Sequence, residues 1–314
     1  MFGRSFVVLT ICAYALHWSL APRLNPAPDW TDRSVLVSGA GSGVGRHTAL
    51  ALVQRGYKVF AGVRTQGDVD RLKAEHPSIN PVLLDVTNLE HVANLNIPGL
   101  CGFVDTAGVG VRHLPLEALT DDEEWKHMYD VNVHGFRRVV QRLLPQLRQC
   151  DGARIISMGS VLGSFAIPSW SADVSTNHAL EALTDALRLE LSSASISVSL
   201  IKAGYIESGL YDKDRFSAAL DPAVERILEH YGGNEQYRDS EARIRSVGKG
   251  GGTLKEAYDV IHDALTSNRP QSRYYVGTSQ GMSAFTLTRL QFLPDVWFDM
   301  VIRATANRRN EIKY

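Results

Sequence analysis

The sequence has few cysteines and no excess charge of either sign, and both shortages narrow what the protein can be. Its 314 residues include 33 Lys and Arg against 34 Asp and Glu, so it presents no overall basic field, and we expect no nucleic-acid partner. The three cysteines, Cys12, Cys101 and Cys150, are too few and too widely spaced for a disulfide framework or a zinc site, so we expect buried free thiols. The ten histidines show no zinc spacing either, and we expect no metal. A hydrophobic content of 44% excludes a disordered or collagen-like chain and suffices for a large core.

An uncharged N-terminal segment, residues 6–21, is short for a membrane-spanning helix. As a helix it would extend about 24 Å, against a hydrocarbon core of about 30 Å. Three interpretations fit: a retained anchor, a cleaved signal peptide, or a soluble helix packed on the domain. We predict that residues 1–28 are an anchor or signal segment that gives membrane association at the endoplasmic reticulum or a similar endomembrane. If the segment is cleaved, we expect the protein in the lumen of the secretory pathway.

Beyond Trp30, short apolar runs rich in β-branched residues alternate with helical or charged stretches. Strands that are apolar on both faces and alternate with helices are typical of a parallel sheet covered by helices. We therefore predict one α/β domain over residues 29–314, with a Rossmann-like, doubly wound parallel sheet. The apolar runs begin at Ser34, Tyr57, Pro81, Cys101, Ala153 and Ile196.

A glycine-rich turn joins the first apolar run to the first helix. Glycines at such a turn let the backbone approach a pyrophosphate, and the helix N-terminus favours its negative charge. The same glycines could instead form a tight turn with no ligand. The position between a strand and a helix favours a dinucleotide site, which we predict to include Ser38, Gly39, Gly41, Ser42, Gly43, Val44 and Gly45.

The Gly-x-x-x-Gly-x-Gly spacing of this turn resembles that of the short-chain dehydrogenase/reductase family, and the likeness extends from Arg33 onward. Asp85-Val86 is similar to the family's segment whose Asp borders the adenine. Asp105-Thr106-Ala107-Gly108 resembles its Asn-Asn-Ala-Gly motif, although neither asparagine is present. Ala203-Gly204-Tyr205-Ile206-Glu207-Ser208 is similar to its Pro-Gly-x-x-x-Thr stretch, which meets the nicotinamide. The resemblance therefore implies further cofactor contacts by Asp85, Val86, Ala107, Gly108, Gly204, Ile206 and Ser208.

Two more positions resemble the family's catalytic apparatus. Asn132 lies in an Asn-x-x-Gly helix motif, and Ser160 falls where the family has its catalytic serine. A closer likeness, to membrane-associated members that act on retinol, hydroxysteroids or 3-hydroxybutyrate, rests on Val59-Phe60-Ala61-Gly62 and Leu293-Pro294-Asp295-Val296-Trp297. This likeness implies a small apolar substrate, a substrate lid at about residues 205–250 and 280–305, and a homodimer.

The end of the second apolar run bears on the choice of cofactor. Val63-Arg64 offers no carboxylate for the adenosine ribose, whereas the arginine can accommodate a 2′-phosphate. NADP(H) is therefore favoured over NAD(H). The alternative is that Arg64 is a solvated residue that opens the next loop.

The side chains that carry the family's proton transfer are missing. The resemblance implies a Tyr thirteen residues after Ser160 and a Lys four residues later, yet Asp173 and Asn177 stand there. No tyrosine occurs in residues 130–204 and no lysine in residues 127–201. Being four apart, Asp173 and Asn177 share one helix face, and burial could raise the carboxyl pKa far enough for it to act as an acid near neutral pH. Asp173 could equally be a solvated or capping residue near the helix start.

Three functions remain compatible with these residues. The first is an oxidoreductase that transfers a hydride between NADP(H) and an apolar alcohol or ketone, such as a retinoid, steroid or lipid-like compound. In it, Ser160 orients the substrate and Asp173 replaces the tyrosine. The second is an NADP(H)-binding pseudoenzyme or regulatory protein, and the third is an elimination or isomerisation on the same scaffold. We predict the first, because most chains with this fold and turn do redox chemistry.

Overall fold

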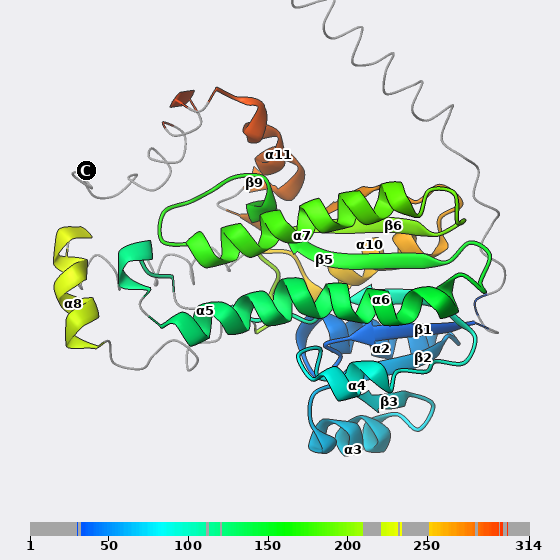
Figure 1. Ribbon diagram of the computed structural model, residues 1–314. Helices are drawn as coiled ribbons and strands as arrows, with labels where there is room; N and C mark the ends of the chain where they lie inside the picture. The colour runs from blue at the N-terminus through cyan, green and yellow to red at the C-terminus, as the bar shows by residue number, and fades with distance from the viewer. Residues whose placement is uncertain are drawn as a thin grey trace, which may run out of the picture.

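A seven-stranded parallel sheet forms the centre of the protein (Figure 1). The computed structural model describes residues 30, 33–110, 113–119, 121–209, 221–231, 233, 251–279, 282–294, 296–297 and 300. The strand order is β3-β2-β1-β4-β5-β6-β7. The strands are β1 (Ser34–Ser38), β2 (Lys58–Val63), β3 (Asn80–Leu83), β4 (Leu100–Asp105), β5 (Arg154–Ser160), β6 (Ser197–Ala203) and β7 (Arg273–Val276).

Burial on both faces explains why the strands are almost continuously apolar. Every residue of β1 and of β4 is buried, because helices cover the sheet from both sides. The predicted Rossmann-like parallel sheet is therefore confirmed. Of the seven strands in this sheet, β7 was not foreseen, since its four residues, Arg-Tyr-Tyr-Val, are too few and too polar to show as an apolar run.

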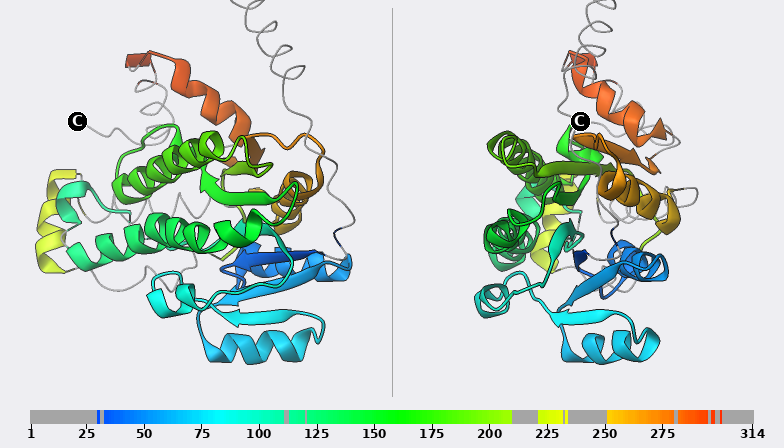
Figure 2. Two further views of the ribbon diagram at one scale, coloured as in Figure 1. Left: turned by 45° about the vertical axis from the view of Figure 1, so that its right-hand side comes forward. Right: turned by 90° about the vertical axis from the view of Figure 1, so that its right-hand side faces the viewer.

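Two helical layers enclose the sheet (Figure 2). Helices α2 and α10 pack against each other on one face, and α4, α6 and α7 lie on the other. The helices are α2 (Gly43–Gln54), α3 (Gln66–Glu75), α4 (Leu89–Ala93), α5 (Asp122–Tyr129), α6 (Phe136–Leu147), α7 (Ser171–Glu190), α8 (Pro222–Leu228), α10 (Leu254–Thr266) and α11 (Ala284–Arg289). Shorter elements are η2 (Leu116–Ala118), η3 (Asp130–Gly135), η4 (Val161–Gly163), η6 (Glu229–Tyr231), η7 (Leu290–Phe292) and the hairpin of β8 (Thr278–Ser279) and β9 (Met282–Ser283).

The order of the strands reverses direction between the paired strands β1 and β4. From β1 the chain continues outward to β2 and β3, and it then crosses back to place β4 on the other side of β1. The helices that follow β1 and β4, α2 and α6, therefore lie on opposite faces of the sheet (Figure 2). In doubly wound sheets this switch point is where ligands bind.

A disulfide corrects the expectation of free thiols. Cys101, in β4, is bonded to Cys150, in the turn that follows α6, and their Cα atoms are 5.4 Å apart. Both side chains are buried, as expected. The pairing was not visible in the sequence because 49 positions separate the two residues, and only the parallel alignment of β4 and β5 brings their ends together.

Part of what the sequence predicts lies outside the described residues. This holds for the anchor or signal segment 1–28 and for much of the predicted lid. Within the described ranges, no helix is both long and apolar enough to cross a membrane. Of the lid segments, α8 packs on η2, and α11 packs on η4 and β7.

Candidate functional site

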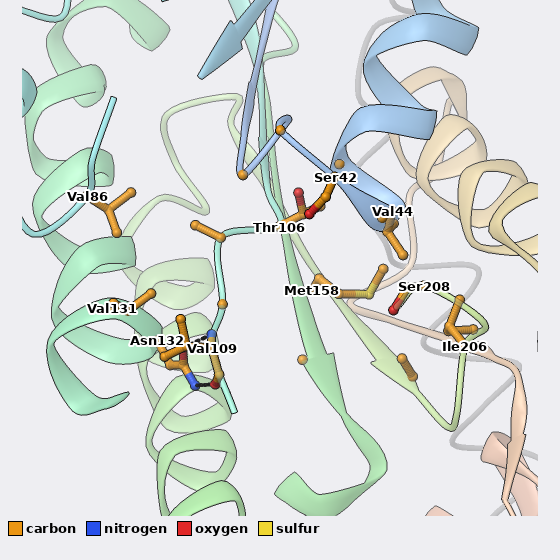
Figure 3. A pocket seen from close by; sticks show the side chains of 18 of the residues that line it. Ser42, Val44, Val86, Thr106, Val109, Val131, Asn132, Met158, Ile206 and Ser208 are labelled. Carbon is orange, nitrogen blue, oxygen red and sulfur yellow. Dashed lines mark hydrogen bonds between the residues drawn. The ribbon is translucent and has the colours of Figure 1, made fainter. Parts of the chain in front are cut away.

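A pocket of about 730 Å³ lies at the carboxyl ends of the central strands (Figure 3). That volume suits a cofactor together with a small substrate. It is lined by every residue predicted for the site except Ser38: Gly39, Gly41, Ser42, Gly43, Val44, Gly45, Arg64, Asp85, Val86, Ala107, Gly108, Asn132, Ser160, Asp173, Asn177, Gly204, Ile206 and Ser208. The fold thus gathers, around one cavity, residues from both ends of the domain.

The glycine turn has the shape of a phosphate cradle. Gly39 has a φ of +65°, and a Cβ on it would lie 2.8 Å from the Ala107 nitrogen. A Cβ on Gly45 would overlap the Thr106 hydroxyl. Ser42, the N-cap of α2, makes no side-chain hydrogen bond to the helix, so its first amide groups have no side-chain cap. A pyrophosphate fits this place, because bare backbone and a helix N-terminus favour an anion.

Ser38 lies beneath the cradle rather than in it. Its side chain is fully buried, and its hydroxyl donates a hydrogen bond of 2.6 Å to Asp105 Oδ1. The Thr106 hydroxyl donates in turn to the Ser38 carbonyl at 2.6 Å. Burial raises the pKa of Asp105 to about 6, against the opposing effect of the Ser38 hydrogen bond. Asp105 and Thr106, which replace the two asparagines of the family motif, therefore clamp β4 to β1, and Ser38 belongs to this clamp instead of to the pocket lining.

Two arginines line the end of the pocket that is predicted to receive the adenosine. Arg64 is exposed at the rim, and its charge acts on Asp85. Although burial opposes it, hydrogen bonds from Thr87 and the Arg64 charge hold the pKa of Asp85 below its ordinary value. Arg71 also lines this end, where it donates to the Gly41 carbonyl at 2.7 Å and to Asp68 at 2.6 Å.

Asn132 is fully engaged with the loop that follows β4. Its Oδ1 accepts a hydrogen bond of 2.9 Å from the Val109 nitrogen, and its Nδ2 donates one of 2.9 Å to the Val109 carbonyl (Figure 3). It sits in η3, a π-helical turn, a distortion found frequently at functional sites. With both ends of its amide bound to backbone, Asn132 holds this loop in place.

Ser160 is the last residue of β5, and its hydroxyl can donate a hydrogen bond into the pocket. Its Oγ accepts a hydrogen bond of 3.1 Å from the Leu162 nitrogen at the start of η4. That bond uses a lone pair of the hydroxyl and fixes its direction, while the O–H remains available. Ser160 can therefore donate to an oxygen that enters the pocket.

Asp173 is buried in the first turn of α7, with 5% of its surface exposed. The N-cap of the helix is Trp170, so the alternative of a solvated or capping residue at 173 is wrong. Burial raises the pKa of this carboxyl to about 6, and the nearby His113 opposes the rise. Among the described residues, no group donates a hydrogen bond to its Oδ2. A carboxyl of this kind can give or take a proton near neutral pH.

Asn177 offers no substitute for a cation. Its Nδ2 donates a hydrogen bond of 2.8 Å to the Asp173 carbonyl and so closes the turn that carries the acid. In the described parts of the chain no lysine lines the pocket. Lys202 of β6 is buried in this region, but its Nζ is paired with Glu181 Oε2 at 2.6 Å. Glu181 lies one helical turn after Asn177 in α7.

Several lining residues escaped the sequence reasoning. Thr176 and Leu180 stand at helical spacing from Asp173, so the periodicity of α7 could have found them. His127, in the last turn of α5, also lines the pocket. Further lining residues lie on elements that only the fold brings to the pocket: Asp68 and Arg71 of α3, Val131 of η3, Leu162 of η4, and Val109 in the loop after β4.

Comparison with known proteins identifies the family. Residues 33–217 match the sequence model of the short chain dehydrogenases. The chain belongs to this family. The resemblance expected from the glycine turn onward is confirmed.

Individual relatives of this short-chain dehydrogenase align along most of its length. Retinol dehydrogenase 7 of Rattus norvegicus is 29% identical, with 86% of the chain and 88% of the relative covered. The 17-beta-hydroxysteroid dehydrogenase type 6 of Homo sapiens is 28% identical, with 92% and 93% covered. A short chain dehydrogenase from Burkholderia cenocepacia, solved in complex with NADP, has a TM-score of 0.61 at 21% identity, with 90% and 96% covered, and shows the shared fold.

Proposed function

We propose that this short-chain dehydrogenase is an NADP(H)-dependent oxidoreductase that interconverts an apolar alcohol and its ketone. One observation carries the proposal: the pocket that begins at the glycine cradle also holds the Ser160 hydroxyl and the buried Asp173 carboxyl. The relatives named for retinol and 17-beta-hydroxysteroids support an apolar substrate. Apolar lining by Met158, Leu162 and Leu180 agrees with it.

The chain's own residues supply orientation and a proton. NADPH, when bound, supplies the hydride that reduces a carbonyl carbon. Ser160 donates a hydrogen bond to the carbonyl oxygen and fixes its direction. Asp173, in its protonated form, gives its proton to that oxygen, and in the oxidative direction the carboxylate takes the proton from the alcohol. Asn177 keeps the turn of α7 closed around the acid through its bond to the Asp173 carbonyl.

Arg64 supports the preference for NADP(H). Its guanidinium is exposed at the adenosine end of the pocket, where it can pair with a 2′-phosphate. The carboxylate of Asp68, which could otherwise repel that phosphate, is paired with Arg71. The Burkholderia structure with NADP is consistent with this cofactor.

The lack of a lysine beside Asp173 in the described pocket favours a second function. The amide of Asn177 is bound to backbone, and no lysine lines the described pocket, so no cation assists the acid. The second candidate is an NADP(H)-binding protein without redox turnover.

Titration followed by turnover separates the two functions. Purified protein is titrated with NADPH and NADH by nicotinamide fluorescence, and then assayed with a panel of retinoids, hydroxysteroids and hydroxy acids. We expect NADPH binding and turnover of an apolar substrate. Asp173→Ala is expected to lower kcat by a factor of about 100 or more with NADPH affinity unchanged, and Glu190→Ala, at the exposed end of the same helix, is the matched control.

Two results would change the assignment. Tight NADPH binding with no turnover across the panel favours the second candidate, and the change Asp173→Tyr with Asn177→Lys should then create activity. Binding of neither dinucleotide contradicts both functions.

We also propose membrane association through residues 1–28, on the luminal side of an endomembrane. The Cys101–Cys150 disulfide supports an oxidising compartment. Exposed apolar side chains after α11, those of Phe292, Val296 and Trp297, are consistent with a nearby lipid surface. Fractionation of membranes from cells that express the full chain or residues 29–314 tests this: we expect only the full chain to resist extraction by salt.

The homodimer remains a prediction, which sedimentation of the purified protein can check.

A further inference from the structure

A buried histidine lies against the acid of the pocket. His113, in the segment after β4, is 3% exposed, and its Nε2 is 3.8 Å from Asp173 Oδ2. The two residues come from elements far apart in the sequence. Nothing in the spacing of either segment indicated the pair, so the fold alone creates it.

The imidazole is held in a fixed plane. It stacks on the Trp170 indole with ring centroids 3.6 Å apart and an interplanar angle of 13°. Trp170 itself packs against the apolar cluster formed by Val161, Leu162, Phe165, Ala284 and Leu287. The residue after the histidine, Leu114, is buried in a second cluster with Ala118, Val224 and Leu228. His113 is therefore secured from both sides, with its Nε2 directed toward Asp173.

The separation of 3.8 Å decides the kind of interaction. It is longer than a direct hydrogen bond, which would require about 3 Å, and short enough for strong electrostatic coupling or for one bridging water. Between two side chains that are almost fully buried, such coupling is weakly screened by solvent. A protonated imidazole would favour the carboxylate form of Asp173, and a neutral one would leave the acid protonated to higher pH.

No other charged group of the described structure takes this position. From α5, His127 lines the pocket, but it is exposed. From η3, Asp130 is paired with Arg138 at 2.6 Å. The residues of η4 and the Thr176 and Asn177 side chains of α7 carry no charge. His113 is therefore the titratable group best placed to act on Asp173.

We propose that His113 is a positioning residue that governs the charge of Asp173 in the pocket. This inference rests on the proposed function, in which Asp173 is the proton donor. In reduction, the carbonyl carbon gains a hydride, the carbonyl oxygen gains the Asp173 proton, and a carboxylate remains beside His113. The His113 ring, when it carries a proton, stabilises that carboxylate until Asp173 regains a proton from solvent. In oxidation the same pair accepts the hydroxyl proton of the alcohol.

The test measures the Asp173 carboxyl directly and so does not depend on turnover. Protein labelled with carbon-13 at its aspartate carboxyls is titrated by NMR, and Asp173→Asn assigns the resonance. His113→Phe keeps a ring on Trp170 but removes the charge, and we expect it to raise the pKa of the Asp173 carboxyl by about 1, a tenfold gain in proton affinity. His113→Gln, which keeps an N–H donor near the Nε2 position, should shift that pKa in the same direction by less. His178→Gln, on the exposed side of α7, should not move it.

Turnover then gives the second readout. In an active enzyme, the pH above which reduction declines should move upward in His113→Phe by the same amount, with KM little changed. An unchanged Asp173 titration in both His113 variants would overturn the inference even if the enzyme is active. A shifted titration in a protein without turnover would support the pair and reject the proposed function.

Discussion

At the scale of single residues, the surroundings of Asp173 matter more than its type. The family pattern implies a tyrosine here, and an Asp carboxyl in water would already be ionised at neutral pH and would have no proton to donate in its place. Burial changes this, because the pocket wall disfavours the charged form and raises the pKa of Asp173 to about 6. The sequence could indicate the carboxyl, but not whether water reaches it.

That raised pKa makes folding stability depend on pH. The folded-state pKa of about 6 lies above the ordinary value of 3.8, so the folded state holds the proton more tightly and stability declines as pH rises from about 4 through 6. Asp173→Asn removes the charge, and we expect it to stabilise the protein at pH 7–8 by up to about 3 kcal/mol, with little effect at pH 4. Urea unfolding at several pH values measures this. Glu190→Gln, at an exposed carboxylate, should give no such dependence, and a pH-independent effect of Asp173→Asn would contradict the burial argument.

Arg64 permits a second test at this scale. If it pairs with the 2′-phosphate, Arg64→Ala should weaken NADPH binding about tenfold or more and leave NADH binding nearly unchanged, because only NADPH carries that charge. Fluorescence titration with both dinucleotides measures the ratio. Arg137→Ala, on the exposed surface of α6, is the control, and equal losses for both dinucleotides would remove the preference.

At the scale of elements, the pocket depends on how closely the turn after β1 approaches the turn after β4. The clamp of Ser38, Asp105 and Thr106 draws the two strand ends together. The glycines of the cradle exist partly for this contact, since side chains at Gly39 and Gly45 would strike the neighbouring turn. The glycine spacing that predicts a dinucleotide site is therefore also required for the packing of the two turns.

The two roles can be separated with a matched pair of substitutions. Gly45→Ala should lower the free energy of unfolding by about 1–3 kcal/mol, because its Cβ would overlap the Thr106 side chain and the Gly39 backbone. Gly41→Ala meets nothing closer than 3.6 Å, so we expect almost no loss of stability from it. Chemical unfolding of the two variants in the absence of dinucleotide makes the comparison, and equal losses would contradict the packing role of Gly45.

At the scale of the whole molecule, the disulfide joins the starts of two neighbouring strands, β4 and β5, at the end of the sheet opposite the pocket. It joins the start of β4 to the turn before β5 and closes a loop of 49 residues. The pocket lies at the carboxyl ends of the same strands. The bond thus stabilises the scaffold without occupying the site.

Loss of this bond should destabilise the entire domain. We expect Cys150→Ser to lower the free energy of unfolding by about 2–4 kcal/mol, because the cross-link restricts the unfolded chain. Thermal unfolding with and without reductant provides the measurement: reductant should destabilise the wild type to the level of the variant and leave the variant unchanged. Cys12→Ser, which leaves the pair intact, is the control. Two alkylated thiols at positions 101 and 150 in unreduced native protein would show that the bond does not form.

The sequence by itself determined the features that depend on neighbouring residues. The apolar runs predict most of the strands, the glycine spacing predicts a dinucleotide turn, and positions 173 and 177 show that the expected tyrosine and lysine are absent. Tertiary structure decided every feature that needs two distant segments. It directed the Ser38 hydroxyl into the β1–β4 clamp, bound the Asn132 amide to Val109, paired Cys101 with Cys150, and placed His113 beside Asp173. The physical reason is that local pattern sets the conformation of a segment, whereas burial and contact depend on which segments the packed sheet and helices bring together.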